Sequence, residues 1–391
     1  MNIYDAAKKI QLPALILDEK AFEFNCRVIS DLPNGKRVRI ATKSIRSVEL
    51  LRKIVKSSSV FNGVMSFSAK EAVFLAERGF NNILIGYPCH DRQSFSSIAK
   101  INRVKNKKII AMVDDVNQVV ALQEIAASEV GMIYVCIDVD MSTFIGGFHF
   151  GVRRSPLSTV ESVLKVAKAI KDSSHLKLVG IMGYEAQIAG VGDDVPNQHM
   201  KNTLIKLLKR MALPKIAKRR QEIVEALKRE GYDISIVNGG GTGSLNTTNQ
   251  EDCITEITVG SALFSPMLFD FYENFLYEPS LYFALPIVRK PTANIFTCLG
   301  GGYIASGPHG KDKVPRPVFP PDGKLMPLEG AGEVQTPVYY KNSALEVGDP
   351  IIFRAAKAGE ICERFDKIYG VYDNSIVTTY LTYRGEGGHF L

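Results

Sequence analysis

The sequence predicts an α/β protein: a (β/α)8 barrel of the TIM type over residues 1–270, followed by a mostly-β domain over residues 271–391. Three observations carry this prediction. Eight short apolar segments, rich in β-branched residues, recur through the first two thirds of the chain, and segments with helical periodicity separate them. Proline and glycine become dense through residues 279–337, where helical periodicity fades. Eight strand–helix units in about 230 residues fit the dimensions of such a barrel.

The eight predicted strands are nearly unbroken apolar runs, as expected for parallel strands that are buried on both faces. They cover residues 38–41, 63–67, 82–86, 109–113, 132–139, 176–182, 234–237 and 254–259. An open, doubly wound sheet would also alternate strands with helices. The number of strands and the absence of a GxGxxG turn after the first strand favour a closed barrel.

Helix signals fill the segments between these strands. Ser68 and Glu71 have the spacing of a capping box, and Gly79 marks the end of that predicted helix. Ser155 followed by Pro156 predicts another helix start, because proline is favoured in the first turn. A stripe with helical spacing follows it, at Val163, Val166, Ala167 and Ile170.

The C-terminal part of the chain has the pattern of β-structure. Residues 338–340, 350–353 and 376–383 are the predicted strands of this domain. The apolar run at residues 12–17 precedes the first barrel strand, so we expect the first ~20 residues to join the β domain.

Composition excludes several classes of protein. In 391 residues, 46% hydrophobic and 23% charged side chains are ordinary globular usage, which excludes a disordered or fibrous chain. No apolar run approaches the ~18 residues of a membrane span, and the N-terminus lacks the apolar stretch of a signal peptide. Six cysteines without a CxxC pair are typical of reduced thiols, so we expect a cytoplasmic protein. The net charge of +7 permits an anionic ligand.

Two glycine-containing loops follow the last two predicted strands, where barrels of this type often bind phosphate. The first contains Asn238, Gly239, Gly240, Gly241, Thr242, Gly243 and Ser244. Glycines let the backbone approach an anion, and the two hydroxyls add donors. The second loop has Gly260 and Ser261 before a predicted helix, whose N-terminus attracts phosphate. Either loop alone could be a simple turn, but both together predict a phosphate site.

Lys43 ends the first barrel strand, on the rim where active sites of this fold lie. Most lysines at strand ends are solvated. A desolvated lysine amine, however, forms Schiff bases with carbonyl groups. A lysine together with a phosphate site therefore suggests pyridoxal phosphate, which needs both.

At these residues the chain resembles the fold-type III pyridoxal-phosphate enzymes, the group of alanine racemase, in the branch of D-serine dehydratase and D-threonine aldolase. The resemblance includes the segments 12–15, 39–44, 183–185 and 239–244, with Glu256, Gly260 and Ser261. The segments 182–190 and 382–387 are similar to the branch described as amino acid deaminase/aldolase.

The resemblance implies a role for each matching residue. Lys43 would hold the cofactor as a Schiff base and later act as a base. Arg153 would reach the cofactor ring and tune how strongly it draws electrons, although Arg153 or Arg154 could also cap a surface loop. Tyr184 would lie beside the ring, or be an ordinary half-buried aromatic at a strand end. Asn238, Gly239, Gly240, Gly241, Thr242, Gly260 and Ser261 would complete the cofactor site.

One departure from the family concerns the metal. The dehydratases and aldolases carry a His-x-Cys or His-x-Asp metal pair near the C-terminus, and residues 373–391 show none. The spacing of Cys362, Glu363, Asp366 and His389 matches no zinc set. Gln187 also stands where aldolases tend to show histidine. A divalent metal such as zinc therefore stays an open question.

The function expected from the resemblance is that of a pyridoxal-phosphate lyase. Its substrate would be a small D-amino acid with a β-hydroxyl group, which it would deaminate, as with D-serine, or cleave, as with D-threonine. A racemase or decarboxylase on the same scaffold is the first alternative, with Tyr303, Tyr339 or Tyr383 as the opposing acid–base group of a racemase. A non-catalytic cofactor carrier is the second, although such proteins are typically a lone barrel. The resemblance also implies a homodimer.

Ten basic residues gather between residues 201 and 229, against Glu222 and Glu225. Such a segment is usually a solvated helix face. Nucleic-acid binding, the third alternative, would need interleaved aromatic residues or a recognised module, and this segment has neither.

Overall fold

The computed structural model describes residues 2–32, 34–308 and 310–391. The chain forms two compact units. The barrel unit consists of residues 29–43, 53–260 and 390–391, and the sheet unit consists of residues 1–28, 44–52 and 261–389. The chain therefore leaves the barrel unit after Gly260.

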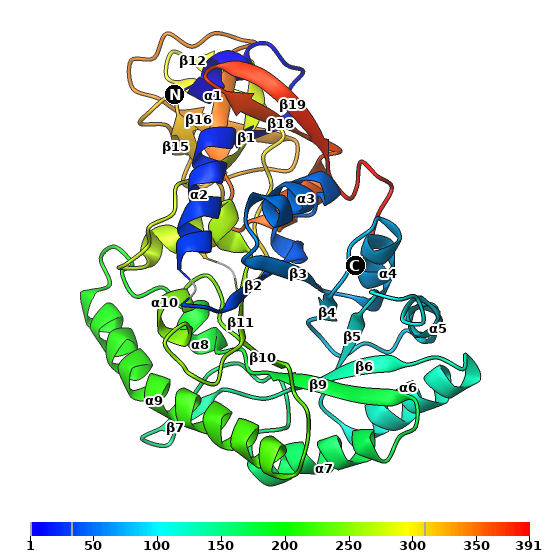
Figure 1. Cartoon of the computed structure of the whole chain (residues 1–391). Helices are drawn as coiled ribbons and strands as arrows, with labels where there is room; N and C mark the ends of the chain where they lie inside the picture. Colours follow the sequence, from blue (N-terminus) through cyan, green and yellow to red (C-terminus); the bar gives the residue numbers. More distant parts are fainter. Residues whose placement is uncertain (1, 33, 309) are drawn as a thin grey trace. The chain divides into compact units, whose positions relative to one another are not determined.

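The barrel unit contains a closed parallel barrel, which has eight strands within the described residues (Figure 1). Around the barrel the order is β10, β11, β2, β3, β4, β5, β6 and β9. The strands are β2 (Arg37–Ala41), β3 (Phe61–Ser66), β4 (Ile83–Ile85), β5 (Ile109–Val113), β6 (Ile133–Asp138), β9 (Leu176–Met182), β10 (Ile236–Gly239) and β11 (Glu256–Val259). Each contains or overlaps one predicted strand, so the closed barrel is confirmed and the open sheet is excluded.

Part of the barrel interior is an apolar core, as the apolar runs predict. Its buried cluster comprises Leu84, Ile110, Met112, Cys136, Val179, Met182 and Ile236. Gly180 is required there, because a Cβ at this position would lie 2.1 Å from the carbonyl oxygen of Ile236 on the neighbouring strand.

Helices cover the outside of the barrel (Figure 1). They are α4 (Ala69–Glu77), α5 (Arg92–Ile101), α6 (Val116–Ser128), α7 (Val160–Lys171) and α9 (His199–Arg229), with the short α8 (Ala186–Ala189) and α10 (Leu245–Thr248) in loops. The helix α3 (Val48–Ser57) begins in the sheet unit and ends in the barrel unit. The Ser68 side chain caps α4 by accepting from the Glu71 N–H, as predicted. The predicted start of α7 at Ser155 is wrong, because Thr159 caps that helix through a capping box with Ser162.

Two features of the barrel unit were absent from the sequence prediction. The strands β7 (Thr143–Ile145) and β8 (Phe148–Phe150) form a hairpin after β6. The basic segment forms nearly all of α9, and it is less solvated than expected. The side chains of Lys209 and Arg220 are buried, and Arg219 donates to the carbonyl oxygens of Asp140 and Ser142.

The sheet unit is built on a nine-stranded sheet within the described residues, with the main order β15-β16-β13-β12-β1-β18-β19 and with β14 and β17 attached to it. Its strands are β1 (Ala14–Asp18), β12 (Leu281–Thr292), β13 (Ile295–Leu299), β14 (Arg316–Phe319), β15 (Lys324–Leu325), β16 (Gln335–Tyr339), β17 (Pro350–Arg354), β18 (Lys367–Tyr372) and β19 (Ser375–Leu381). The N-terminal strand β1 pairs antiparallel with β12 and parallel with β18. The unit also contains α1 (Asn2–Ala7), most of α2 (Glu19–Asp31), and the 3-10 turns η2 (Ser261–Leu263), η3 (Met267–Phe271), η4 (Lys311–Lys313) and η5 (Gly359–Arg364).

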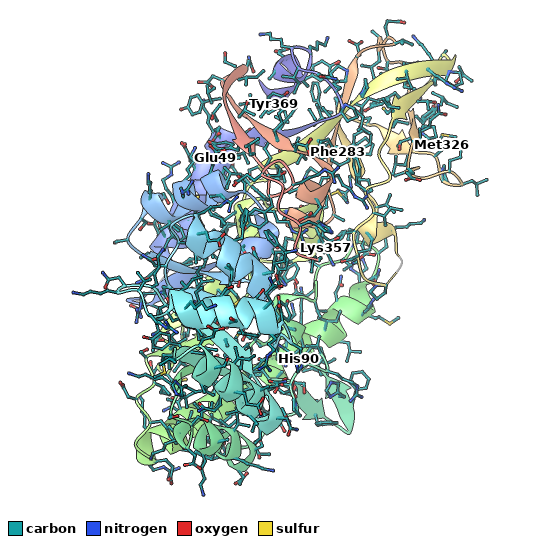
Figure 2. The ribbon with its side chains drawn as sticks, turned by 90° about the vertical axis from the view of Figure 1, so that its right-hand side faces the viewer. Glu49, His90, Phe283, Met326, Lys357 and Tyr369 are labelled. Carbon is teal, nitrogen blue, oxygen red and sulfur yellow. The ribbon has the colours of Figure 1, made fainter. Side chains whose placement is uncertain are left out.

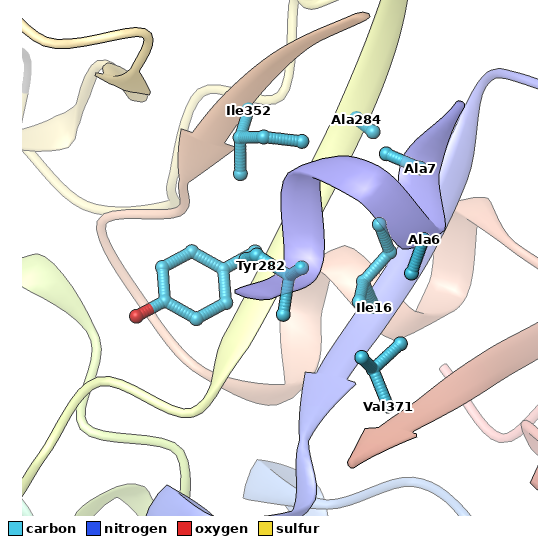
Figure 3. Packing of buried hydrophobic residues seen from close by; sticks show 8 residues of the cluster. Ala6, Ala7, Ile16, Tyr282, Ala284, Ile352 and Val371 are labelled. Carbon is cyan, nitrogen blue, oxygen red and sulfur yellow. The ribbon is translucent and has the colours of Figure 1, made fainter. Parts of the chain in front are cut away.

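Two apolar clusters hold the sheet unit together. Helix α1 packs on the sheet through Ala6 and Ala7, against residues that include Ile16, Tyr282 and Ile352 (Figure 3). Phe283 on β12, which is labelled in Figure 2, is fully buried and stacks on Phe353 with ring centroids 5.1 Å apart. The predicted strands overlap β16, β17 and β19, whereas β12, β13, β14, β15 and β18 were not predicted.

Candidate active site

Lys43 lies where the sequence predicts it, at the carboxyl end of β2. It is the middle residue of the 3-10 turn η1 (Thr42–Ser44). The Thr42 hydroxyl donates to the carbonyl oxygen of Met65 at 2.9 Å, which anchors this turn to β3. The Lys43 amine thereby projects from a fixed backbone at the rim of the barrel.

Tyr87 is the neighbour of Lys43 that sequence reasoning missed. It follows β4, and its hydroxyl oxygen is 2.8 Å from Lys43 Nζ. The Nζ atom also lies 5.4 Å from the centre of the Tyr87 ring. Tyr87 is 37% exposed, so solvent reaches the residue that contacts the lysine amine. The strand-end rule applied to the segment 82–86 places Tyr87 at the rim, but it does not give the contact with Lys43.

Arg154 brings a second cation to Tyr87. Its guanidinium carbon lies 4.9 Å from the Tyr87 ring centre and 5.6 Å from the Tyr184 ring centre. The guanidinium is fixed by Asp138 at the end of β6, at 2.8 Å, and by the carbonyl oxygen of Gly86, at 2.7 Å. The side chain of Arg153, which we predicted for the cofactor ring, is exposed, so the structure brings Arg154 and not Arg153 to the tyrosines.

The charges around these side chains shift their acidities. Burial would raise the pKa of Tyr87, but the positive charges of Lys43 and Arg154 outweigh burial and leave that pKa below its ordinary value. Burial and the nearby Glu185 carboxylate raise the pKa of Tyr184 well above its ordinary value. Burial raises the pKa of Asp138 to about 6, although Arg154 acts in the opposite direction. Of the two phenols, Tyr87 therefore gives up its proton more easily.

The glycine loop after β10 lies against Tyr184. A Cβ on Gly241 would be 2.8 Å from a Tyr184 ring carbon and 2.9 Å from the Cβ of Ala189, so only glycine fits without a shift. Gly240 has a φ of +82°, in the left-handed region that favours glycine. The structure thus brings together Tyr184 and the predicted glycine loop, with Thr242 half-buried in that loop.

Glu185 fixes the glycine loop through hydrogen bonds to its carboxylate. Its fully buried carboxylate accepts from the N–H of Gly240 at 3.3 Å and from the hydroxyl of Ser244 at 2.6 Å. It also accepts from the hydroxyl of Thr248 in α10. A buried carboxylate with several donors can fix loop backbone firmly. Glu185 lies in the segment 183–185 that carries the family resemblance, but the sequence predicts no role for it.

Arg220 of α9 pairs with Glu185 at 2.8 Å, and both side chains are buried. The same guanidinium donates to the carbonyl oxygen of Gly183 at 2.7 Å and pairs with Glu251. A Cβ on Gly239 would lie 3.1 Å from an Arg220 nitrogen, so Gly239 leaves space for the guanidinium. Part of the basic segment is therefore a support for the glycine loop.

Asn238, predicted to bind the cofactor, belongs to a polar network inside the barrel. Its amide donates to Glu256 at 2.9 Å and to Thr258 at 2.8 Å. Glu256 also receives two hydrogen bonds from the buried Arg39, at 2.6 and 2.9 Å. Pairing of this kind is what a buried carboxylate requires. The Asn238 amide thus connects the ends of β10 and β11.

The second predicted phosphate loop follows β11. Gly260 is the residue directly after that strand, and Ser261 begins η2 in the sheet unit. The Ser261 hydroxyl oxygen lies 3.3 Å from that of Ser44.

The residues considered for a metal lie in ordinary packing. Cys362 is buried, which raises its pKa to about 12, and His389 is 3.9 Å from Glu363. The amide of the buried Gln187 donates to the carbonyl oxygen of Met141 at 2.6 Å. Within residues 2–32, 34–308 and 310–391, no three histidine, cysteine, aspartate or glutamate side chains are grouped so that they could hold a metal ion.

The three tyrosines named for a racemase all belong to the sheet unit. Tyr383 is fully buried, and Tyr303 packs edge-on against Phe283 and Phe365. Tyr339 ends β16 and is partly buried.

Among the helices that the structure describes, none combines the length and apolarity of a membrane span.

The sequence profile of the alanine racemase N-terminal domain matches residues 17–266, well over half of the chain. The chain belongs to this family. The match confirms the resemblance to fold-type III pyridoxal-phosphate enzymes, and with it pyridoxal phosphate as the cofactor.

The chain is also similar in sequence to a characterised enzyme. The chain is 27% identical over 258 residues to 3-hydroxy-D-aspartate aldolase of Paracoccus denitrificans (strain Pd 1222), a match that covers 66% of this chain and 61% of the relative. The chain thus spans less than two thirds of that relative's length.

Solved structures share the fold at lower identity. D-threonine aldolase from Filomicrobium marinum superposes with a TM-score of 0.82 at 18% identity, covering 98% of this chain and 97% of the other. D-threo-3-hydroxyaspartate dehydratase from Delftia sp. HT23 gives 0.70 at 16% identity, covering 96% and 98%. These likenesses confirm the predicted fold class.

The site residues fit the cofactor that this family uses. Gly241 places the backbone of this loop directly against Tyr184, so the loop and that ring form one surface. Pyridoxal phosphate has an aldehyde and an anionic phosphate. The Lys43 amine after β2 matches the aldehyde, and the glycine loop after β10 matches the phosphate.

Proposed function

We propose that the protein is a pyridoxal-phosphate lyase that acts on a small D-amino acid with a β-hydroxyl group, through a Schiff base on Lys43. The observation that carries this proposal is the Lys43 amine at the carboxyl end of β2, 2.8 Å from the Tyr87 hydroxyl. The names of the relatives support the substrate class, since one is a 3-hydroxy-D-aspartate aldolase and another a D-threonine aldolase.

Several residues would hold the cofactor. We assign the phosphate to the loop of Gly239, Gly240, Gly241 and Thr242 and to the loop of Gly260 and Ser261, with Asn238 fixing the first loop from inside the barrel. We assign the ring contacts to Tyr184 and to Arg154, in place of Arg153, because Arg154 is the arginine beside the tyrosine rings.

The chain's own residues would then carry out the proton transfers. When bound, pyridoxal phosphate supplies an electron sink that weakens the bonds at the substrate's Cα. Lys43 Nζ takes the Cα proton when the β-hydroxyl is to leave, which gives deamination. If instead a base takes the proton of the β-hydroxyl, the Cα–Cβ bond breaks, which gives aldol cleavage. The placement of acids and bases decides between the two outcomes.

A covalent trap tests the lysine. Borohydride reduction of the purified holoenzyme, followed by peptide mapping, should label Lys43, and Lys43→Ala should lose the label and the turnover. Lys56→Ala, on the exposed end of α3, is the matched control and should keep both. A label on another lysine, or full activity in Lys43→Ala, would refute the proposal.

A product assay tests the reaction. D-serine, D-threonine, D-alanine and 3-hydroxy-D-aspartate are incubated with the enzyme, with and without a chelator, and the products are analysed for oxo acid, aldehyde and chirality. Oxo acid or aldehyde formed only from the β-hydroxy substrates is the expected result. Racemised D-alanine would favour the racemase, and loss of activity with chelator would establish the metal.

We further infer a cytoplasmic homodimer whose cofactor domain covers residues 1–270 and whose β domain covers residues 271–391. The family resemblance supports the dimer, and the six cysteines without a CxxC pair support a reducing compartment. The pairing of β1 with β12 and β18 supports the assignment of the first ~20 residues to the β domain. Light scattering coupled to size exclusion measures the oligomeric state, and a monomeric mass would contradict the dimer.

A further inference from the structure

Tyr87 is the side chain at the rim that none of the cofactor contacts proposed above uses. Its hydroxyl contacts Lys43 Nζ, and its ring faces the Arg154 guanidinium. Arg154 is itself held by the Asp138 carboxylate and the Gly86 carbonyl. These four side chains come from the ends of β2, β4 and β6 and from the segment after β8, so the barrel itself sets their spacing.

We propose that Tyr87 is a catalytic residue that exchanges a proton with Lys43, and that Arg154, held by Asp138, is the positioning residue that keeps Tyr87 ready to do so. This inference rests on the proposed role of Lys43 as the Schiff-base lysine.

The exchange is balanced and needs no other reactant. A proton leaves the Lys43 ammonium as its N–H bond breaks, and it forms an O–H bond on the Tyr87 phenolate, which leaves a neutral amine and a neutral phenol. The reverse transfer restores the ammonium. The 2.8 Å separation is within the reach of a direct proton transfer.

The exchange has two uses in the reaction. Only a neutral amine can form a Schiff base or take a proton from Cα, and Tyr87 can create it by accepting the ammonium proton. After Lys43 has taken a proton from Cα, the amine must lose it again before the next cycle. Because Tyr87 is 37% exposed, it can pass that proton to water.

The electrostatics agree with this role. Free tyrosine and lysine side chains have ordinary pKa values near 10, so a proton is shared between such groups at little cost. Lys43 and Arg154 lower the pKa of Tyr87, which increases the population of phenolate. The other ionisable groups that face it are Tyr184, across Arg154, and Asp138, behind Arg154. The Cys89 thiol donates to the backbone carbonyl oxygen of Tyr87.

A spectroscopic titration of the full chain tests the inference without an activity measurement. The ultraviolet absorbance of phenolate is followed against pH for the wild type and for Tyr87→Phe, and the difference between the two curves belongs to Tyr87. We expect a midpoint below about 10, the ordinary value for tyrosine. Arg154→Met should move that midpoint upward, which also reads out the positioning role if Tyr87→Phe fails to fold.

Tyr134→Phe is the matched control. Lys108 Nζ lies 5.3 Å from the Tyr134 ring centre, nearly the distance between Lys43 and the Tyr87 ring, but Tyr134 belongs to the barrel core and not to the rim. This variant should leave the pH dependence of turnover unchanged. Tyr87→Phe should lower turnover by about 10²–10⁴-fold, the usual contribution of an acid–base group, and should change the pH profile.

The outcomes separate this inference from the proposed function. If borohydride still labels Lys43 in Tyr87→Phe while turnover falls and the profile changes, both stand. If the label stays and the rate and profile match the wild type, the role of Tyr87 is refuted but that of Lys43 survives. If the label is on another lysine, the proposed function fails, whatever the titration of Tyr87 shows. A Tyr87 midpoint at or above the ordinary value would overturn the inference in any case.

Discussion

Two arginine–carboxylate pairs stand at the ends of the barrel strands, and their surroundings differ. Arg220 and Glu185 are both fully buried, and the Glu185 carboxylate also accepts from Gly240, Ser244 and Thr248. In the second pair Arg154 is 16% exposed, and no described residue donates to the buried Oδ1 atom of Asp138. The first carboxylate is saturated with donors, and the second is not.

The same end of the barrel therefore holds one ion pair that stabilises backbone and one whose carboxylate can change its protonation state. A buried carboxylate with several donors fixes the backbone around it, here the glycine loop. A buried carboxylate with one unsatisfied oxygen resists ionisation, and burial accordingly raises the pKa of Asp138 to about 6. The Glu185 pair is therefore suited to support, and the Asp138 pair to regulating the charge next to Tyr87.

Breaking the pair of Arg220 and Glu185 should have the largest effect on the free energy of unfolding. Glu185→Ala leaves Arg220 buried without one of its two carboxylates, and breaking such a pair costs about 3–5 kcal/mol. Denaturant unfolding measures the loss. Glu225→Ala, at an exposed position of the same helix as Arg220, is the control and should stay within about 0.5 kcal/mol. Equal losses in both variants would contradict a special role for Glu185.

The pair of Arg154 and Asp138 should make the free energy of unfolding depend on pH. The pKa of Asp138 is about 6 in the folded protein, against an unfolded value of about 3.9, so the folded state binds more protons between these values. The contribution of Asp138 to stability is therefore most favourable below about pH 4 and falls as pH rises toward 6. Asp138→Asn removes this fall, which amounts to about 2–3 kcal/mol.

Unfolding experiments at a series of pH values compare the two proteins. The free energy of unfolding of the wild type, taken relative to Asp138→Asn, should decrease across this window. The exposed Asp172→Asn should follow the wild type at every pH. A difference between wild type and Asp138→Asn that does not vary with pH would show that Arg154 fully compensates the burial of Asp138.

The glycine loop should respond to a single added methyl group. The Cβ of Gly241→Ala would lie 2.8 Å from the Tyr184 ring, so the ring or the loop must move, at a cost of about 1–3 kcal/mol. Cofactor dissociation constants and unfolding curves measure the effect. Adding Ala189→Gly removes the second close contact, at 2.9 Å, and should restore part of the loss. An additive double mutant would contradict this steric explanation.

The sequence alone was sufficient for the barrel, because its signals are local. A parallel strand buried on both faces is an apolar run whatever its neighbours are, and a capping serine such as Ser68 acts within one turn. The strand β12 was missed because Pro286 and Pro291 interrupt its pattern, while pairing with β1 and β17 keeps its first half extended.

In the candidate site, the sequence predicted only those residues that follow a barrel strand and belong to a recognisable motif. Lys43 and the glycine loop were found in this way. The roles of Tyr87, Arg154 and Glu185 depend on distances between segments far apart in sequence, which no local pattern encodes. The basic segment shows the same limit, because burial of Lys209 and Arg220 depends on Asp193, Glu185 and Glu251 on other elements.

The smallest expected effect concerns the two adjacent arginines, which only the structure distinguishes. Arg154→Lys keeps the charge but loses the planar contacts with the Tyr87 and Tyr184 rings and one of two fixed hydrogen bonds, at about 1 kcal/mol in cofactor affinity. Arg153→Lys, at an exposed position, should change that affinity by less than about 0.5 kcal/mol. Fluorescence titration with pyridoxal phosphate measures both. A larger loss in Arg153→Lys would return the ring contact to Arg153, and the Asp138 pair would then act on Tyr87 alone.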